Sequence, residues 1–170
     1  MQIRSITLEN AADIDLIARR MRATLIEVEG EEAGGNLYSM EWLRERVRWH
    51  LDGRAAEVVV AEDNPGDVLG HTIYRIDVDE SGSSVGLIST TFVIPTARRH
   101  GVAQALLDHA EQWFLQRGTS ESSTWTSASN TALIKLYHRN GYAEAERGPN
   151  QLTRTMMVRL AKRLVRAAVP

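Results

Sequence analysis

The sequence of 170 residues contains no cysteine. This absence excludes disulfides, thiolate nucleophiles and zinc–thiolate sites, and it agrees with a reducing compartment. The formal net charge is only -2, which argues against a domain that binds nucleic acid through its overall charge. No stretch approaches the roughly 18 unbroken apolar residues of a membrane-spanning helix. The N-terminus lacks the cationic start and apolar block of a signal peptide. We therefore expect a cytoplasmic protein without nucleic-acid or membrane partners.

Metal-binding patterns are missing as well. The five histidines form no HExxH-like pair, so we expect no metal. The content of 43% hydrophobic and 25% charged residues is that of a soluble globular protein, and the length fits one domain. We place this domain at residues 1–160 and assign residues 161–170 to a basic C-terminal tail. Leu160, Leu164 and Ala168 share one helical face there, which favours a solvated or dimer-packing segment, with nucleic-acid contact as the alternative.

Hydrophobic periodicity and turn residues define the expected order of elements. We expect helices at residues 10–29, 40–51, 101–117 and 130–140. We expect strands at residues 3–8, 57–61, 68–78, 85–94, 122–127, 142–146 and 152–160. The stretch 27–36 (EVEGEEAGGN) is expected to form an acidic, glycine-bearing loop. This order predicts a mixed α/β layout around one sheet.

The stretch from Val93 to Gln104 combines a strand end, a basic turn and a helix start. The first amides of a helix lack intrahelical partners and carry the positive end of the helix dipole, so they bind phosphate well. Gly101 lets the backbone approach an anion without a Cβ in the way. Arg98, Arg99 and His100 add positive charge beside those amides. The alternative is that the cations are only solvated and that the glycine serves only the turn.

Asn130 and Tyr137 lie seven residues apart on the last expected helix, close to two turns, so their side chains fall on one face. Each residue has a purely structural interpretation. Asn130 stands where the helix begins and would serve as its N-cap. Tyr137 would serve as an aromatic residue of the core. A functional role for either residue therefore needs support beyond the spacing.

Together the two stretches resemble the GNAT superfamily of N-acetyltransferases. The first matches the family's Q/R-x-x-G-x-G/A motif with Arg98, Gly101 and Ala103. The second matches its N-x-A…LY…GF signature with Asn130, Ala132, Leu136, Tyr137, Gly141 and Tyr142. The resemblance implies an α/β (α+β) fold with a mixed, mostly antiparallel central sheet of about seven strands and helices on both faces. It also implies acetyl-CoA as cosubstrate, an amine as acceptor, and a homodimer.

The resemblance also assigns roles to residues. The backbone of Thr91, Phe92 and Val93 would pair with the pantetheine arm, on a strand that the family splays from the one carrying Trp125. The pyrophosphate would lie on the amides of Arg99 to Gln104. The residues implied to bind coenzyme A are Thr91, Phe92, Val93, Arg98, Arg99, His100, Gly101, Val102, Ala103, Gln104 and Asn130. Tyr137 would lie near the thioester sulfur as the catalytic residue.

The implied reaction is attack of an amine on the thioester carbonyl, followed by departure of the thiolate. A phenol with a pKa near 10 can donate a proton to a thiolate whose conjugate acid has a pKa of about 8.5. We expect Tyr137 to play this role. Several relatives carry a glutamate base five residues before the asparagine, but Trp125 occupies that position here. Other candidates for the base are a water chain or Asp77, Asp79, His71, Glu27, Glu29, Glu31 and Glu32.

The segment that joins the first two helices usually forms a wall of the acceptor site in this family. Here it combines carboxylates with aromatic side chains, namely Glu27, Glu29, Glu31, Glu32, Tyr38, Trp42 and Trp49. Such a surface attracts a cationic amine, which favours a small polyamine-like or amino-sugar acceptor. A solvated loop with core tryptophans is the structural alternative. Acetylation of a protein N-terminus or lysine, and a non-catalytic acetyl-CoA-binding module, are the alternative functions.

Overall fold

The computed structural model of the chain describes residues 1–165. Its helices are α1 (Ala11–Glu29), α2 (Glu31–Asn36), α3 (Met40–Leu51), the 3-10 helix η1 (Pro95–Ala97), α4 (Val102–Gln116) and α5 (Thr131–Arg139). Its strands are β1 (Gln2–Ser5), β2 (Ala56–Glu62), β3 (Val68–Val78), β4 (Ser84–Val93), β5 (Glu121–Ser127), β6 (Ala143–Pro149) and β7 (Met156–Arg163).

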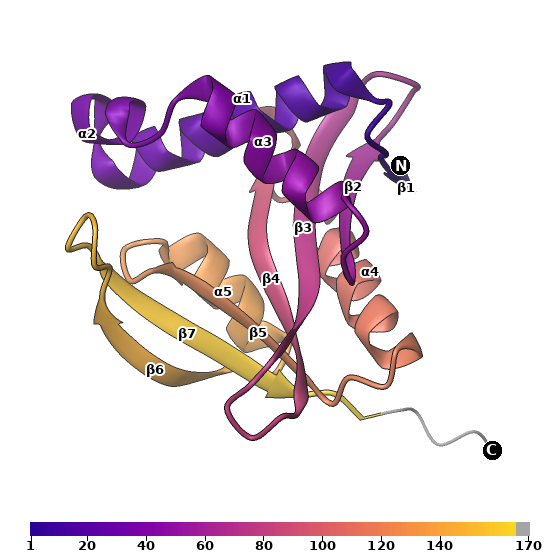
Figure 1. The fold of residues 1–170 in the computed structure, drawn as a ribbon, viewed down its shortest axis with the longest axis vertical. Helices are drawn as coiled ribbons and strands as arrows, with labels where there is room; N and C mark the ends of the chain where they lie inside the picture. The colour runs from indigo at the N-terminus through magenta and orange to yellow at the C-terminus, as the bar shows by residue number, and fades with distance from the viewer. Residues whose placement is uncertain (166–170) are drawn as a thin grey trace. The chain divides into compact units, whose positions relative to one another are not determined.

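Hydrogen bonds join the seven strands in the order β1-β2-β3-β4-β5-β7-β6 (Figure 1). The pairs β1–β2, β2–β3, β5–β7 and β6–β7 are antiparallel, whereas β4 and β5 run parallel. The sheet is therefore mixed and has the number of strands that the family resemblance implies. This confirms the expected fold class.

The acidic segment 27–36 is not the loop that we expected. Helix α1 continues to Glu29, Gly30 turns the chain with φ 87°, and α2 follows at once. The amide of Gly34 donates to the carbonyl of Gly30 at 2.8 Å. A Cβ on Gly34 would lie 2.3 Å from the carbonyl oxygen of Leu25, so glycine lets α2 pack directly on the backbone of α1. Tertiary contact thus overrides the poor helix propensity of these glycines.

Contacts divide the chain into two compact units, and the first comprises Met1–Arg75 and Thr90–Leu106. Its core joins β1 to β3 with α1 and α3, which pack against each other (Figure 1). The buried core residues are Ile6, Ile14, Ile17, Val47, Val58, Val60, Val68 and Ile73. Ile14 and Ile17 are the residues by which α1 enters this core. Asn10 precedes this helix, but its side chain accepts from the amide of Thr7 at 2.8 Å and does not cap α1.

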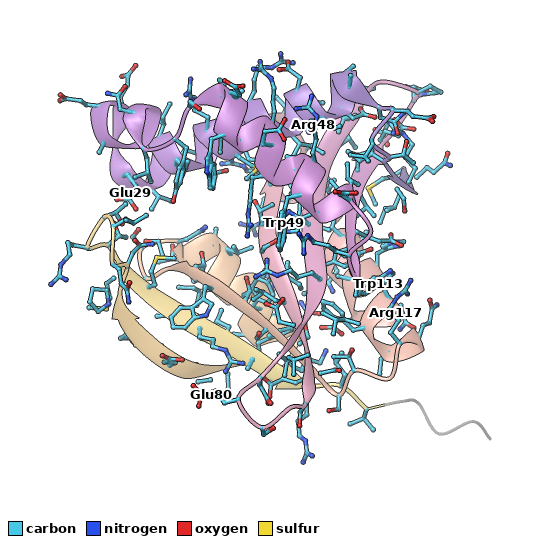
Figure 2. All side chains as sticks on the ribbon, viewed as in Figure 1. Glu29, Arg48, Trp49, Glu80, Trp113 and Arg117 are labelled. Atoms are coloured by element: carbon cyan, nitrogen blue, oxygen red, sulfur yellow. The ribbon has the colours of Figure 1, made fainter. Side chains whose placement is uncertain are left out.

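The second unit comprises Ile76–Ser89 and the residues from Leu107 onward. Phe114 of α4 is completely buried and packs against Gly86 of β4, where a Cβ would come within 2.6 Å of the ring. At the end of α4 the Arg117 guanidinium lies 3.8 Å from the centre of the Trp113 ring, and Figure 2 labels both residues. Arginine near a helix C-terminus also interacts favourably with the helix dipole.

The last strand, β7, continues to Arg163, three residues beyond the expected strand end, so residues 161–163 pair in the sheet. Leu164 follows with a backbone hydrogen bond to Ser120 at 2.8 Å. Ala168, the other residue of the expected tail helix, lies outside the described residues. Among residues 1–165, no helix is both long enough and apolar enough to cross a membrane.

Candidate functional site

The turn between β4 and α4 presents main-chain groups, as the sequence predicts. The first backbone hydrogen bond of α4 runs from the amide of Ala105 to the carbonyl of Gly101 at 3.0 Å. The amides just before Ala105 therefore precede the helical hydrogen-bond ladder. Gly101 is exposed, has φ 82°, and a Cβ built on it would meet nothing within 4 Å. The turn thus offers an open helix N-terminus of the kind that binds anions.

The basic side chains of this turn are exposed, and two of them hold its shape. Nε of Arg98 donates to the carbonyl of Val93 at 3.0 Å, and the guanidinium pairs with Glu27 at 3.4 Å. Nδ1 of His100 lies 2.9 Å from the carbonyl of Arg98. Arg99 adopts a left-handed φ of 70°, which is uncommon for a residue with a side chain. Arg98 and His100 therefore organise the turn in addition to contributing charge.

The segment Thr91–Val93 forms the end of β4. The hydroxyl of Thr72 on β3 donates to the carbonyl of Thr90 at 2.9 Å and lies 3.0 Å from the hydroxyl of Thr91. The parallel pairs between β4 and β5 comprise Gly86, Leu87 and Ile88 with Ser122, Ser123 and Thr124. The predicted pantetheine-binding residues Thr91–Val93 thus lie beyond the last of these pairs.

In the second unit, Tyr137 lies on α5 and Asn130 directly precedes this helix. Oδ1 of Asn130 accepts from the amide of Leu133 at 3.3 Å, so Asn130 is the N-cap of this helix. Tyr137 is only 2% exposed, and its ring meets the Tyr142 ring edge-to-face, with centroids 4.7 Å apart and an interplanar angle of 78°. The structural roles foreseen for both residues are therefore present. Their roles toward a coenzyme stay predictions.

Tyr142 anchors this aromatic pair. Its hydroxyl donates to Oγ of Ser122 on β5 at 2.7 Å, and both side chains are buried. Burial raises the pKa of Tyr142 well above its usual value, so this phenol stays neutral. Nearby, Nζ of Lys162 binds both oxygens of Glu111 at 2.9 and 2.8 Å and lies 5.6 Å from the centre of the Tyr142 ring. The sequence signature contained Tyr142 but gave no sign of this network.

The position of the expected glutamate base is taken by Trp125, which is 39% exposed on β5. The glutamate of this strand, Glu121, pairs with Arg159 at 2.6 Å. Among the other candidates, Asp79 stabilises a turn, because it accepts from the hydroxyl of Ser81 at 2.6 Å and from the amides of Ser83 and Ser81. The hydrogen bond from the Ser81 hydroxyl, and then that from the Ser83 amide, lower the pKa of Asp79.

His71 is completely buried, and neither of its ring nitrogens has a hydrogen-bond partner within residues 1–165. Burial and then the nearby Arg20 guanidinium lower its pKa to about 3. A group with so low a pKa is a poor acceptor for the proton of an amine. His71 is therefore neutral near pH 7 and unsuited to the role of general base.

The predicted acceptor wall shows a division among its aromatic residues. Tyr38 and Trp42 stack with centroids 4.0 Å apart at 11°, and Trp42 is 44% exposed. Trp49, labelled in Figure 2, already faces the guanidinium groups of Arg46 and Arg54 at 4.3 and 3.9 Å. A cationic ligand can therefore reach the stacked pair but not the Trp49 ring, because two arginine guanidinium groups already lie over that ring.

One charged residue of the first unit was missed by the sequence analysis. Arg20 lies on α1 one turn after the buried Ile17, and its guanidinium is 5.5 Å from the centre of the Phe92 ring on β4. The available signal was an arginine three positions after Ile17, on the side of the helix that carries the apolar stripe.

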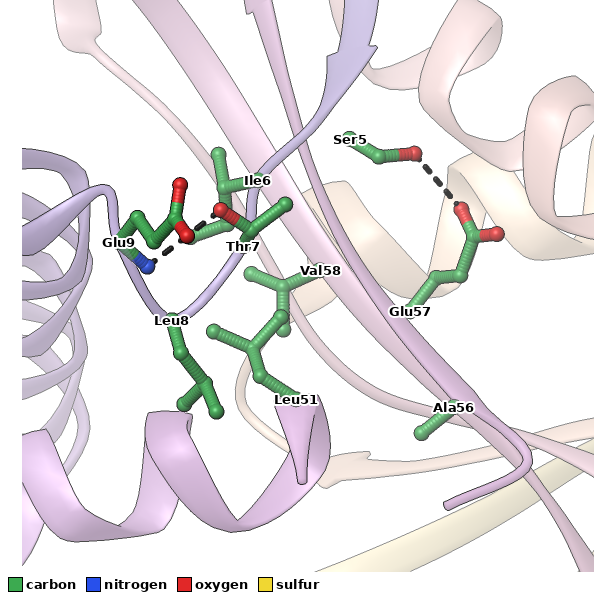
Figure 3. A pocket seen from close by; sticks show the side chains of 9 residues that line it. All are labelled: Ser5, Ile6, Thr7, Leu8, Glu9, Leu51, Ala56, Glu57 and Val58. Carbon is green, nitrogen blue, oxygen red and sulfur yellow. Dashed lines mark hydrogen bonds between the residues drawn. The ribbon is translucent and has the colours of Figure 1, made fainter. Parts of the chain in front are cut away.

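An open pocket of about 430 Å³ lies elsewhere in the first unit, between the end of β1, Leu51 of α3 and residues 56–58 of β2 (Figure 3). The hydroxyl of Ser5 donates to Glu57 at 2.9 Å in this pocket. None of the residues predicted to bind coenzyme lines it. No group of three or more histidine or acidic side chains able to hold a metal occurs among residues 1–165.

Comparison with known proteins places the chain in a family. The model of the acetyltransferase (GNAT) family matches residues 22–142. The aminoglycoside N(6')-acetyltransferase type 1 of Klebsiella aerogenes is 33% identical over 94 residues, which cover 54% of this chain and 62% of that protein. The chain thus spans less than two thirds of this curated relative.

Two solved structures share the fold. A chain of the NatC complex bound to Gag peptide and CoA superposes with a TM-score of 0.75 at 20% identity, covering 97% of this chain and 100% of that one. The ribosomal-protein-S18-alanine N-acetyltransferase from Escherichia coli superposes with a TM-score of 0.69 at 20% identity, covering 98% and 96%. Because the family model matches more than half of the chain, the protein belongs to the GNAT family of acetyltransferases.

Proposed function

We propose that this protein is an acetyl-CoA-dependent N-acetyltransferase that moves an acetyl group to the primary amine of a small molecule. The observation that carries the proposal is the open helix N-terminus at Gly101, with its left-handed backbone and its amides ahead of the α4 ladder. Membership of the GNAT family and the coenzyme bound in the NatC structure support the same choice of cosubstrate.

The residues of the turn fit a diphosphate. The amides of Arg99 to Gln104 would hold its oxygens, since the N-terminus of a helix favours negative charge. Arg98, Arg99 and His100 are exposed beside them and would add positive charge without needing to leave the solvent. The main chain of Thr91–Val93 would hold the pantetheine arm as an added strand. Asn130 would contribute a side-chain hydrogen bond while it caps α5.

The thioester supplies an activated acetyl group, and the residues of the chain guide its transfer. The amine nitrogen forms a bond to the acetyl carbon while the carbon–sulfur bond breaks. A main-chain N–H near Phe92 or Val93 would stabilise the negative charge that develops on the carbonyl oxygen. The Tyr137 hydroxyl would donate its proton to the departing sulfur. Water would take the proton of the amine, because Trp125 occupies the position of the expected base.

A small amine fits the surroundings of α1 and α2. Glu27 and Glu29 lie in the last turn of α1, where Figure 2 labels Glu29, and Glu31 and Glu32 begin α2. This acidic segment attracts cations, and the Tyr38–Trp42 stack, in which Trp42 is exposed, follows it along the chain. The likeness to an aminoglycoside acetyltransferase, a protein whose name specifies a small amine acceptor, supports this class.

The test is a thiol-release assay with acetyl-CoA across a panel of acceptors. The panel contains polyamines, amino sugars, amino acids and short peptides with free N-termini. We expect turnover of at least one small amine and formation of the N-acetyl product by mass spectrometry. Binding of acetyl-CoA with no transfer to any acceptor would contradict the proposal and would favour a non-catalytic coenzyme-binding module. Trp125 is consistent with such a module, because it occupies the position of the expected glutamate base.

Acetylation of a protein N-terminus is the second candidate. The fold shared with the ribosomal-protein-S18-alanine N-acetyltransferase favours it. Under this alternative, peptides would turn over with a higher kcat/KM than any small amine in the panel. The comparison of kcat/KM values within one assay therefore separates the two candidates.

A further inference from the structure

In the described part of the chain, Arg20 is a cation without an anionic partner. One amino group of its guanidinium donates to the carbonyl of Val68 at 2.5 Å, whereas the other, NH1, is buried and has no hydrogen-bond partner. Within residues 1–165 this side chain forms no ion pair. Burial lowers its pKa, which shows that the surroundings disfavour the charge. Among the described residues, the half-buried guanidinium therefore has a carbonyl and an aromatic ring as neighbours but no anion.

A second unsatisfied side chain lies at the same aromatic ring. His71 of β3 stacks on Phe92 of β4, with ring centroids 5.9 Å apart and an interplanar angle of 17°. The guanidinium of Arg20 lies 5.5 Å from the centre of that ring. His71 is completely buried, neither ring nitrogen has a partner, and its pKa of about 3 keeps it neutral near pH 7. Its N–H is thus a donor with no acceptor among the described residues.

Buried charges in proteins are paired or bind a ligand, because an isolated buried charge is costly. A guanidinium matches a carboxylate especially well, since its parallel N–H groups fit the two carboxylate oxygens. The unpaired amino group of Arg20 and the N–H of His71 therefore point to a compact planar anion. The diphosphate of the coenzyme is already assigned to the turn at Gly101, so the anion belongs to another ligand.

The position of Phe92 indicates which ligand that is. Phe92 lies within Thr91–Val93, the segment proposed to hold the thioester arm, so Arg20 lies beside the strand along which the acetyl group would be held. We infer that Arg20, assisted by His71, binds a carboxylate of the acceptor, and that the acceptor is an amino-acid-like molecule with both an amine and a carboxylate. This inference rests on the proposed function and narrows it. The acidic segment of α1 and α2 attracts the ammonium group of the same molecule. The carboxylate and the ammonium group of the acceptor would thus each face a group of opposite charge.

The test compares acceptors that differ only in the carboxylate. Amino acids and their carboxamides are assayed by thiol release with the wild-type protein, Arg20→Gln and the control Arg19→Gln. Arg19 is the neighbouring arginine of α1, and its side chain is 59% exposed and paired with Asp15. For the wild type we expect KM to be about 10- to 100-fold lower for an amino acid than for its carboxamide. Arg20→Gln should abolish this preference, whereas Arg19→Gln should retain it.

Two further readouts separate a binding role from a structural one. In the control Arg19→Gln, the KM for acetyl-CoA and the kcat for the carboxamide should stay within about twofold of the wild type, whereas in Arg20→Gln the rise in KM should be confined to acceptors with a carboxylate. His71→Gln should weaken the preference for the carboxylate by less than Arg20→Gln does. A global loss of kcat with every acceptor would show a structural role and would overturn the inference.

The outcomes also distinguish the inference from the proposed function. Acetylation of amines with no preference for a carboxylate would overturn the inference and leave the proposed function standing. Absence of acetyl-CoA binding by calorimetry would overturn the proposed function. If acetyl-CoA binds but no acceptor reacts, thermal unfolding of the coenzyme-bound protein tests whether Arg20 binds the carboxylate. The inference then requires that amino acids raise the Tm of the wild type and leave that of Arg20→Gln unchanged, and equal behaviour of the two proteins would overturn it.

Discussion

The turn before α4 and the helix α5 both carry predicted site residues, but they present different parts of the chain. The turn is exposed and offers its main chain, since Gly101 has no side chain and Arg98 points back to the carbonyl of Val93. Helix α5 offers side chains, with Asn130 at its start and the buried Tyr137 against Tyr142. A main-chain site depends on backbone conformation, whereas a side-chain site depends on single functional groups. The two regions should therefore respond differently to substitution.

The largest effect is expected for Tyr137→Phe, which removes one hydroxyl from the side-chain region. If this phenol protonates the departing thiolate, kcat should fall by about 10- to 1000-fold with little change in the affinity for coenzyme. Steady-state kinetics and calorimetry measure the two quantities. An unchanged kcat would show that Tyr137 is only a core residue and that its hydroxyl takes no part in the reaction.

Gly101→Ala tests the main-chain region by altering the backbone alone. A Cβ at Gly101 meets nothing within 4 Å, but a φ of 82° strains any other residue by roughly 1–2 kcal/mol. Because the amides would shift, the affinity for acetyl-CoA should fall about 10-fold, the effect of weakening one hydrogen bond to a charged group. Calorimetry measures this loss.

Gly118→Ala is the matched control. Gly118 follows α4 with φ 76° and is equally open, so the substitution imposes the same strain away from the turn. Both variants should lose similar free energy of unfolding, and only Gly101→Ala should lose affinity. Equal affinities in the two variants would mean that the turn does not bind the coenzyme.

Tyr142→Phe tests which of the two tyrosine hydroxyls in the side-chain region acts in the reaction. The substitution keeps the ring that meets Tyr137 but removes the hydroxyl that donates to Ser122, leaving a buried hydroxyl without its partner. The free energy of unfolding should fall by about 1–3 kcal/mol. The kcat should fall less than in Tyr137→Phe, since the aromatic contact remains. Urea unfolding checks the first value, and a loss of kcat as large as that of Tyr137→Phe would assign the chemistry to Tyr142.

The smallest effects concern Arg98, the side chain that shapes the main-chain region. Arg98→Ala should weaken coenzyme binding by a few-fold, because the bond to the carbonyl of Val93 and a positive charge are both lost. Glu27→Gln removes only the exposed ion pair at 3.4 Å and should change stability by less than about 1 kcal/mol. Titrations of both variants with acetyl-CoA compare how much coenzyme affinity each variant loses. A larger loss in Glu27→Gln than in Arg98→Ala would contradict the role given to the carbonyl bond.

Much of the fold followed from local patterns. The apolar periods predicted α1 and α3 at nearly their observed bounds, and the strand expected at residues 68–78 is β3. Helix α2 was missed because its two glycines argue against a helix in isolation. What stabilises α2 is the close approach of Gly34 to the backbone of Leu25, and no local pattern records such a contact.

The candidate site was predictable where function lies in a short motif and hidden where it depends on distant residues. Gly101 and Tyr137 belong to contiguous stretches that the sequence singles out. The contacts of Arg20, His71 and Phe92 join α1, β3 and β4, so they arise only once the chain has folded. The same holds for the hydrogen bond between Tyr142 and Ser122.

The most direct test of the account is a calorimetric titration of the protein with acetyl-CoA, repeated with Gly101→Ala. The account predicts saturable binding of one coenzyme per chain, with an affinity about 10-fold weaker in the variant. The absence of saturable binding in the wild type would contradict the claim that the amides preceding Ala105 hold the diphosphate of the coenzyme.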